Sequence, residues 1–241
     1  MTPNVFFSYP AGMTAAAACA VFAACMPTIQ KEHPPVSIEI RRLIVGPLEN
    51  NTYVVSDGKK AALVIDPSIG CGEVLSYIDK QKLTVASILL THAHFDHIMG
   101  IPDIHKVFPD APVYVHPLDR MFLTKPQFNG SPMMGRPYAY TGPVQDLTEG
   151  AMTVAGFSFT VVLVPGHTPG GCALLFGDQC FCGDIIFAGS IGRSDFPGGD
   201  ADALINGIRE KIFTLPDETV LLSGHGGRTA VGREKKYNPF F

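Results

Sequence analysis

The sequence of 241 residues has no run of like charges and no long, strongly apolar stretch. Its 22 acidic and 18 basic side chains give a formal net charge of −4 and are mixed along the chain. Because a nucleic-acid site usually shows as a basic stripe, we expect no nucleic acid as a partner. The apolar segment at residues 11–27 is rich in alanine and falls short of the about 20 strongly apolar residues that span a bilayer. We therefore expect no membrane partner.

The chain also lacks any pair of cysteines separated by two residues. Its six cysteines are too sparse for a scaffold held by disulfides, so a reducing cytoplasm is the expected location. Cys180 and Cys182 alternate within an apolar segment. We predict that they are two small buried thiols on one face of a strand.

No lysine or arginine precedes Lys31, although a secretory signal needs a positively charged start. We interpret residues 1–35 as a disordered extension, with Met26 as an alternative start, and residues 36–241 as one domain. A leader that is cleaved, or lipidated at Cys25, and that exports the protein remains the alternative.

From Val36 onward, short apolar runs end in turn residues, which is typical of strands. The predicted strands lie within residues 36–46, 51–58, 61–67, 85–92, 111–117, 157–167, 172–178, 180–184 and 219–225. Helical spacing appears at residues 71–82, 97–108, 118–123 and 201–215. Strands with helices at intervals predict an α/β (α+β) fold, in which helices cover sheets. Residues 124–150 have no clear period and are predicted as a long loop that serves as a lid or binding loop.

Ligand-type side chains cluster in the heptapeptide Thr91–His97, directly after an apolar run. His92 and His94 are alternate residues leaving a strand, so they share a face and can converge on one ion. Asp96 and His97 follow about one turn later and can reach a second ion beside the first. A solvated polar loop would not explain four such residues in six positions.

Three more apolar runs each end in a glycine followed by a ligand-type residue, namely His167, Asp184 and His225. Ligands of open α/β sheets gather at the carboxyl ends of strands, so we expect these residues to converge on one crevice. Gly166, Gly183 and Gly224 fit a backbone that turns sharply and approaches the site closely.

These motifs, HAHFDH, PGHTPG, CGD and SGHG, resemble the metallo-β-lactamase superfamily over nearly all of the chain after residue 36. The segments GSIGRSDFPGGD and NPFF resemble small bacterial hydrolases related to glyoxalase II, the hydroxyacylglutathione hydrolases. The resemblance implies a single-domain, four-layer αββα sandwich. It also implies a first metal held by His92, His94 and His167, a second held by Asp96, His97 and His225, and Asp184 as a bridge.

Imidazole and carboxylate ligands suit zinc, which we expect in both sites, with iron or manganese as alternatives. Two cations about 3.5 to 4 Å apart keep hydroxide present near pH 7, and that bridging hydroxide is the expected nucleophile. We expect Asp96 and Asp184 to take part in catalysis. The predicted enzyme is a binuclear metallohydrolase whose substrate is a small acyl thioester such as hydroxyacyl-glutathione.

Four further residues are predicted to support the site. Asp66 is a candidate for orienting a ligand histidine, with a turn-forming role before proline as the alternative. Arg193, Tyr138 and Tyr140 are predicted to contact the substrate, and a structural pair with Asp195 is the alternative for Arg193. Only 16 residues follow His225, so the carboxy-terminal domain that holds glutathione in full-length glyoxalase II is not expected here.

Two other functions are compatible with the motifs. One is an iron-dependent persulfide dioxygenase with a single iron on His92, His167 and Asp184, which leaves His94 outside the site. The other is a metal-binding scaffold without activity. A β-lactamase is less favoured, because no cysteine occupies the position of Asp184. The sequence leaves the oligomeric state open.

Overall fold

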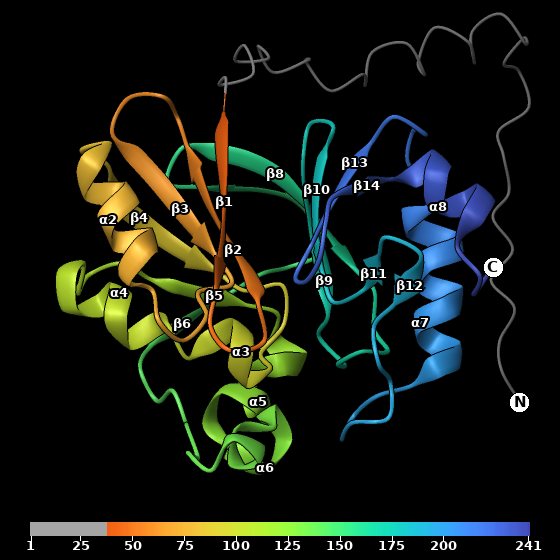
Figure 1. Cartoon of the computed structure of the whole chain (residues 1–241), viewed down its shortest axis with the longest axis horizontal. Helices are drawn as coiled ribbons and strands as arrows, with labels where there is room; N and C mark the ends of the chain where they lie inside the picture. Colours follow the sequence, from red (N-terminus) through yellow and green to blue (C-terminus); the bar gives the residue numbers. More distant parts are fainter. Residues whose placement is uncertain (1–37) are drawn as a thin grey trace, which may run out of the picture. The chain divides into compact units, whose positions relative to one another are not determined.

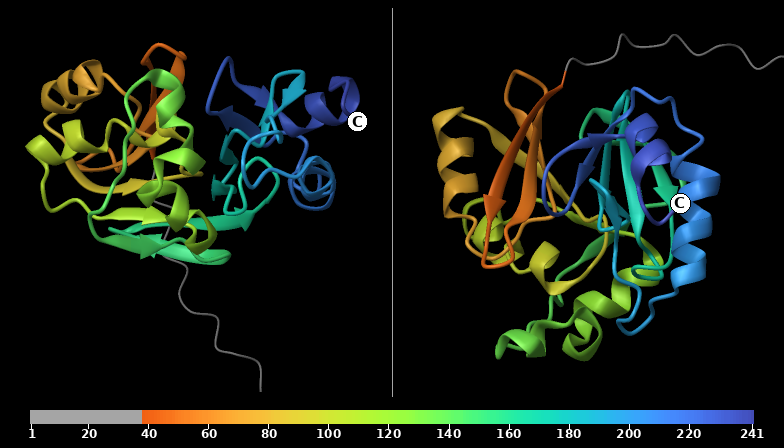
Figure 2. Two further views of the ribbon diagram at one scale, coloured as in Figure 1. Left: turned by 90° about the horizontal axis from the view of Figure 1, so that it is seen from below. Right: turned by 45° about the vertical axis from the view of Figure 1, so that its right-hand side comes forward.

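The computed structural model describes residues 38–241, in which two six-stranded sheets lie face to face (Figures 1 and 2). The first sheet has its strands in chain order: β1 (Glu39–Val45), β2 (Asn50–Ser56), β3 (Ala61–Ile65), β4 (Thr84–Leu89), β5 (Val113–Val115) and β6 (Val144–Asp146). Strands β1 to β3 pair antiparallel, whereas β3 to β6 pair parallel.

The second sheet has the order β14-β13-β10-β9-β8-β7. Its strands are β7 (Gly150–Val154), β8 (Phe157–Leu163), β9 (Cys172–Phe176), β10 (Gln179–Gly183), β13 (Val220–Ser223) and β14 (Thr229–Ala230). Strands β8 and β10 each pair antiparallel with β9, and β10 pairs parallel with β13. Strands β8, β10 and β13 therefore run in one direction and end at one edge of the sheet. A separate small hairpin consists of β11 (Ile186–Phe187) and β12 (Ser190–Ile191).

Helices cover the outer face of each sheet (Figure 1). Helices α2 (Gly72–Lys80) and α4 (Ile101–Val107) lie on the first sheet, and α7 (Ala201–Gly207), the π-helical turn η3 (Ile208–Ile212) and α8 (Val231–Tyr237) lie on the second. Shorter helices follow β4 and β5: α3 (Phe95–Ile98), η1 (Pro117–Asp119), α5 (Arg120–Thr124), α6 (Pro126–Asn129) and η2 (Ser131–Met134). The predicted four-layer αββα sandwich is therefore confirmed.

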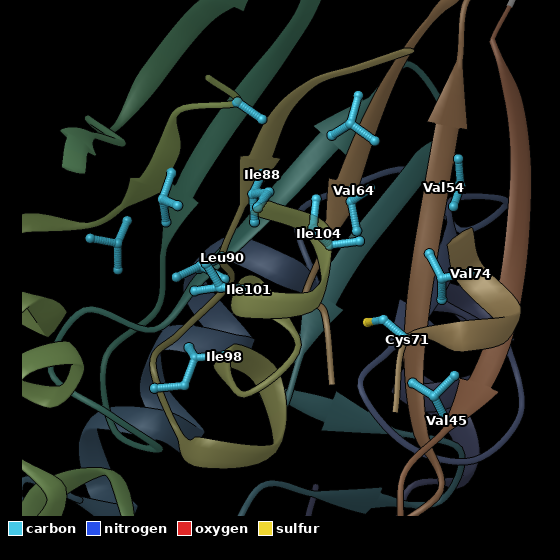
Figure 3. Close-up of a cluster of buried hydrophobic side chains, with 14 of the residues drawn as sticks. Val45, Val54, Val64, Cys71, Val74, Ile88, Leu90, Ile98, Ile101 and Ile104 are labelled. Carbon is cyan, nitrogen blue, oxygen red and sulfur yellow. The ribbon is translucent and has the colours of Figure 1, made fainter. Parts of the chain in front are cut away.

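The alternation of side chains along the central strands explains the four layers. Val54 and Val64 point to the cluster under α2 and α4 (Figure 3), whereas Val55 and Leu63 point to the cluster between the sheets. A strand whose two faces are both covered reads as a continuous apolar run, as β3 (AALVI) does. Truncating one of these fully buried side chains, for example Leu63→Ala, should cost about 2–5 kcal/mol of stability.

The same alternation places the two neighbouring thiols. Cys180 and Cys182 face α7 and α8, while Phe181 between them faces the other sheet. Both thiols are fully buried and free, which confirms the prediction of two small core residues on one strand face. Cys19 and Cys25 lie outside the described residues, as does the segment interpreted as an N-terminal extension.

The predicted helices are present but more broken than expected. The helix expected over residues 97–108 is split into α3 and α4 at Gly100, whose amide donates to the carbonyl of Pro67. A side chain at Gly100 would overlap Cys71 and the backbone of Ser68, so this close approach requires glycine. The loop predicted at 124–150 contains α6, η2 and β6, and α8 was not expected. None of the helices in residues 38–241 is long and apolar enough to cross a membrane.

Candidate metal centre

Strand ends from both sheets deliver the predicted ligands to one place. His167, Asp184 and His225 follow β8, β10 and β13, which all end at the same edge of the second sheet. His92 and His94 follow β4 of the first sheet. Figure 1 shows α3, which carries Asp96 and His97, at this end of the sandwich.

The first group consists of His92, His94 and His167, all buried. Nε2 of His167 lies 2.8 Å from Nδ1 of His94 and 3.2 Å from Nε2 of His92. Three nitrogens this close together face a common point. This is the arrangement of a metal site with three imidazole ligands, and it leaves positions open for a further ligand or a substrate.

The second group consists of Asp96, His97 and His225. Oδ2 of Asp96 lies 3.1 Å from Nε2 of His225 and 3.6 Å from Nε2 of His97. The side chain of His225 is 27% exposed, whereas that of His97 is fully buried. The second group therefore mixes nitrogen with oxygen and is more open than the first.

The carboxylate of Asp184 lies between the two groups. Oδ1 is 3.4 Å from Nε2 of His97, and Oδ2 is 3.6 Å from Nε2 of His167 and 3.7 Å from Nε2 of His225. Oδ1 is buried without a hydrogen-bond partner among the described residues. A carboxylate in this position could bind one ion with each oxygen, as the bridging role requires.

The hydrogen bonds of the ring nitrogens that point away from the centre determine which nitrogen of each ring directs an unprotonated lone pair into it. Three histidines have Nδ1 beside an oxygen that can only accept: His97 beside Oδ2 of Asp66 at 3.0 Å, His167 beside the carbonyl of Arg193 at 2.6 Å, and His225 beside the carbonyl of Leu48 at 3.0 Å. Nδ1 must then carry the proton, so in the neutral ring Nε2 is an unprotonated ligand atom directed into the cluster.

The charges of the centre also fit bound cations. Burial lowers the pKa of His92 well below its ordinary value and that of His94 to about 3, so both rings are neutral. Burial opposes a charge on His97 as well, but Asp96, Asp184 and Asp66 together raise its pKa well above the ordinary value. Asp66 and Asp96 are buried, the side chain of Asp184 is only 12% exposed, and these three carboxylates beside the neutral rings of His92 and His94 would be costly without compensating positive charge. Residues of these types, so arranged, fit two divalent metal ions.

Two of the three predicted glycines are required by close contacts within the centre. A side chain at Gly224 would overlap Oδ1 of Asp184 and the ring of His97. Gly183 has φ +47 and leaves no room for a Cβ beside Thr91. The residues before Asp184 and His225 therefore have to be glycine for the strand ends to come this close.

The role predicted for Asp66 agrees with its contacts. Besides His97, its carboxylate accepts from the amide of Thr91 at 2.8 Å and from the hydroxyl of Thr91 at 2.6 Å. Asp66 has φ +51, a conformation that costs free energy for a residue other than glycine. Because three donors converge on this carboxylate, its position is well defined, and it orients the His97 ring.

The sequence did not reveal Asp119, a fully buried carboxylate in η1. It accepts from the amides of Ala93 and Gly170 at 3.0 and 2.6 Å and from the hydroxyl of Thr168 at 2.8 Å. Ala93 lies between His92 and His94, and Thr168 follows His167. Asp119 therefore ties together the two loops that carry the first group. No pattern in the sequence distinguishes this aspartate from a surface residue.

Asn51 was also missed. Its side-chain amide donates to the carbonyls of Ser223 and Gly226 at 2.9 Å, on either side of His225. The main-chain amide of Asn51 donates to the carbonyl of Gly224 at 2.7 Å. The start of β2 thus clamps the loop that carries His225.

A cavity of about 930 Å³ opens over the centre, and the residues predicted to contact a substrate differ in their relation to it. Arg193 lines the cavity, but its guanidinium binds Asp195 through two hydrogen bonds of 2.9 and 2.8 Å, so the predicted alternative pair is present.

Tyr138 and Tyr140 do not line the cavity and instead pack against the cluster under α4, which corrects their predicted role. Hydrogen bonds from the Asn129 amide to the carbonyl of Tyr138, and from Tyr140 to the carbonyl of Leu123, turn this segment back toward the core. Residues 127–134 take the wall position instead.

The family model of the metallo-beta-lactamase superfamily matches residues 45–225, and the chain belongs to this superfamily. Among the curated relatives, the chain is 38% identical to a probable metallo-hydrolase, YqgX, of Bacillus subtilis over 83% of this chain and 96% of the relative. It is 32% identical to the hydroxyacylglutathione hydrolase GloC of Haemophilus influenzae, over 85% of this chain and 98% of the relative.

Two solved structures are similar as well. The BLEG-1 B3 metallo-beta-lactamase superposes with a TM-score of 0.80 at 37% identity, and the match covers 84% of this chain and 99% of the lactamase chain. TTHA1623 in a di-iron-bound form has a TM-score of 0.76 at 36% identity and covers 83% of this chain and 100% of its own. These similarities confirm the predicted superfamily and fold.

Proposed function

We propose that the chain is a two-metal hydrolase of small acyl thioesters, a class that includes hydroxyacyl-glutathione. The observation that carries this proposal is the convergence of two ligand groups on the carboxylate of Asp184, beneath one open cavity. The similarity to GloC over nearly its whole length supports thioester hydrolysis. Zinc is the proposed metal, and the similarity to a di-iron protein supports iron as the alternative.

In this proposal His92, His94 and His167 hold the first ion, and Asp96, His97 and His225 hold the second, with Asp184 shared. When bound, two divalent ions lower the pKa of a water and polarise a carbonyl. The chain itself supplies the geometry: Asp66 and the carbonyls of Arg193 and Leu48 hold the ligand rings in place. Asp96 also lines the cavity, and we assign the carboxylate oxygen of Asp96 that does not hold the ion as the acceptor of the proton released by the attacking water.

Metal analysis and a thiol-release assay on the full-length protein test this function. The protein loaded with zinc, and separately with iron(II), should hold two ions per chain and release thiol from S-lactoyl-glutathione. His92→Ala should lose most of this activity, whereas His105→Gln should keep it, because the His105 ring binds the carbonyl of Ala111 away from the centre. Two bound ions without thiol release from any acyl thioester would overturn the proposal.

Hydrolysis of β-lactams is a second candidate, favoured by the similarity to the BLEG-1 enzyme. The same cavity and the same ligand groups would serve that reaction, since both reactions attack an acyl carbonyl. A cephalosporin assayed beside the thioester decides between the two. We expect kcat/KM for the thioester to exceed that for the cephalosporin at least about a hundredfold, and the opposite order would favour the lactamase.

The two alternatives from the sequence differ from the hydrolase in metal count or in turnover. A persulfide dioxygenase would bind one iron without His94 and would consume oxygen, and an inactive scaffold would show no turnover. Nδ1 of His94 lies within 2.8 Å of Nε2 of His167, which supports a role for His94 as a ligand. Loss of metal in His94→Ala, with no oxygen uptake by the parent protein, would favour the hydrolase.

A further inference from the structure

The cavity over the candidate metal centre has a polar floor and apolar walls. The floor is formed by ligand residues, including His94, Asp96 and His225. One part of the wall comes from α3, α6 and η2, and another from the segment after β10. A substrate whose carbonyl reaches the floor must therefore place its remaining atoms against these walls.

The wall from α3, α6 and η2 is formed largely by Phe95, Phe128, Met133 and Met134. Met133 is 71% exposed, and Leu48, which lines the cavity from the β1–β2 turn, is 46% exposed. When a hydrocarbon covers large apolar side chains that face water next to a reactive centre, the loss of exposed apolar surface stabilises the complex. Methionine is also flexible enough to adapt to chains of different shape.

Charge recognition is weak on the same walls. Among the described residues that line the cavity, Arg193 is the only cation outside the ligand groups. Its guanidinium is already bound by both oxygens of Asp195 and lies 4.3 Å from the centre of the Phe196 ring. Nε and Nη2 of Arg193 are committed to Asp195, so a substrate carboxylate would meet a guanidinium whose charge is already balanced by a neighbouring carboxylate. Such an exposed pair adds little net free energy to the binding of a further carboxylate.

We propose that the preferred substrate is an acyl thioester with an uncharged hydrocarbon acyl chain, held by the methionine and phenylalanine wall, and that the thiol carrier is not selected by its charge. This inference rests on the proposed thioester hydrolysis and narrows it. It distinguishes the chain from an enzyme that recognises the two carboxylates of glutathione.

Four thioesters test both halves of the proposal on the full-length, metal-loaded protein: acetyl and hexanoyl groups, each on N-acetylcysteamine and on glutathione. Complete burial of one methylene favours binding about fourfold. The hexanoyl group has four more methylenes than the acetyl group, so their partial burial should make kcat/KM for the hexanoyl thioester about thirtyfold higher. The two carriers of one acyl group should differ by less than about threefold. Equal rates for acetyl and hexanoyl, or a thirtyfold preference for glutathione, would overturn the proposal.

Binding separates this inference from the proposed reaction. S-hexyl- and S-ethyl-N-acetylcysteamine are thioethers that cannot be hydrolysed, and calorimetry gives their affinities directly. The hexyl compound should bind about thirtyfold more tightly. If it does and no thioester is hydrolysed, the proposed reaction fails while the apolar preference stands. If thioesters are hydrolysed but the two thioethers bind equally, the apolar preference fails alone.

Two variants locate the effect within the cavity. Met133→Gln changes an exposed side chain and should lower the hexanoyl-to-acetyl ratio about fivefold. Met121→Gln, at an exposed methionine of α5 that does not line the cavity, is the matched control and should leave the ratio unchanged.

Asp195→Asn releases Arg193 from its partner and should raise kcat/KM for the glutathione thioester at least about fivefold relative to the neutral carrier. No change in this variant would mean that the pair does not suppress carrier recognition, and would overturn that part of the proposal.

Discussion

The two ligand groups of the centre have the same purpose in our proposal but very different surroundings. His92, His94 and His167 form a buried group of three neutral rings, whose pKa values are lowered by burial. Asp96, His97 and His225 form a group that contains a carboxylate and is partly open to solvent. The comparison indicates that the first site is shaped by packing and hydrogen bonds to the loops, whereas the second is shaped by charge.

The largest effect should follow from removing the carboxylate that the two groups share. Asp184→Asn should reduce kcat/KM about a thousandfold, or ~4 kcal/mol of transition-state stabilisation, and lower the metal content of both sites, because its carboxylate lies beside ligand nitrogens of both groups. Metal analysis with the thiol-release assay measures both. Asp178→Asn, an exposed aspartate beside the start of β10, is the control and should retain full activity. Full two-metal occupancy in Asp184→Asn would refute the bridging role.

A single-ligand change should separate the two groups. His225→Ala should leave about one ion per chain, because the first group remains intact, while kcat/KM falls at least about a hundredfold. His92→Ala should instead empty the first site. Titration of each variant with a chelator of known affinity measures the remaining site. If both variants lose both ions completely, the groups are not separate sites and the comparison fails.

The contact that orients the second group should have the next largest effect. Asp66→Asn removes a charge-assisted hydrogen bond to His97 and should weaken the second ion about 10–100-fold, with little change at the first site. Asp57→Asn is the matched control, since the carboxylate of Asp57 caps the turn between β2 and β3 and has no hydrogen bond to a ligand residue. Equal weakening of both ions would show that Asp66 supports the fold as a whole.

Asp119 has the corresponding role for the first group, with a smaller expected effect on metal. The carboxylate of Asp119 accepts three hydrogen bonds, and in Asp119→Asn the side-chain NH2 group would face at least one of these donors. Because that donor loses its acceptor, the free energy of unfolding should fall by about 2 kcal/mol. We expect the first ion to weaken about tenfold because the two loops are no longer tied. Urea unfolding gives the stability, and chelator titration gives the affinity. Loss of stability without loss of affinity for the first ion would limit Asp119 to a structural role.

The smallest effect should appear in the stability of the metal-free protein, to which the two groups contribute with opposite dependence on pH. Buried His94, with a pKa lowered to about 3, costs stability as the pH falls below about 6.5, because the unfolded chain binds a proton that the folded chain does not. His225, whose pKa is raised by Asp96 against the effect of burial, loses stability as the pH rises from about 6.5 through its folded pKa.

Thermal unfolding of the metal-free protein between pH 5 and pH 8 tests this difference. The loss of stability on the acidic side should be about 1 kcal/mol or more for His94. His94→Asn should flatten the acidic side of the profile and His225→Asn the alkaline side. The same slope on both sides in the two variants would contradict the contrast between the groups.

Much of the fold and of the centre could be predicted from the sequence, because both depend on residue types at regular positions. Apolar runs of strand length indicated the sheets, and the alternation that fills two cores at once lies in runs such as AALVI and CFCG. Ligand residues that follow strands are brought together by strand direction alone. This is why His92, His167, Asp184 and His225 could be predicted to converge before their distances were known.

Only the tertiary structure decided the contacts that do not depend on residue type, because such contacts leave no pattern in the sequence. The carbonyls of Leu48 and Arg193 orient two ligand rings, and a carbonyl carries no information about its side chain. Met133 rather than Tyr138 lines the cavity because hydrogen bonds from Asn129 return the tyrosine segment to the core. Asp119 is recognisable only through its three donors, which come from segments far apart in the chain. The sequence by itself therefore determined the sheets and the ligand types, and long-range packing decided their orientation and the shape of the cavity above them.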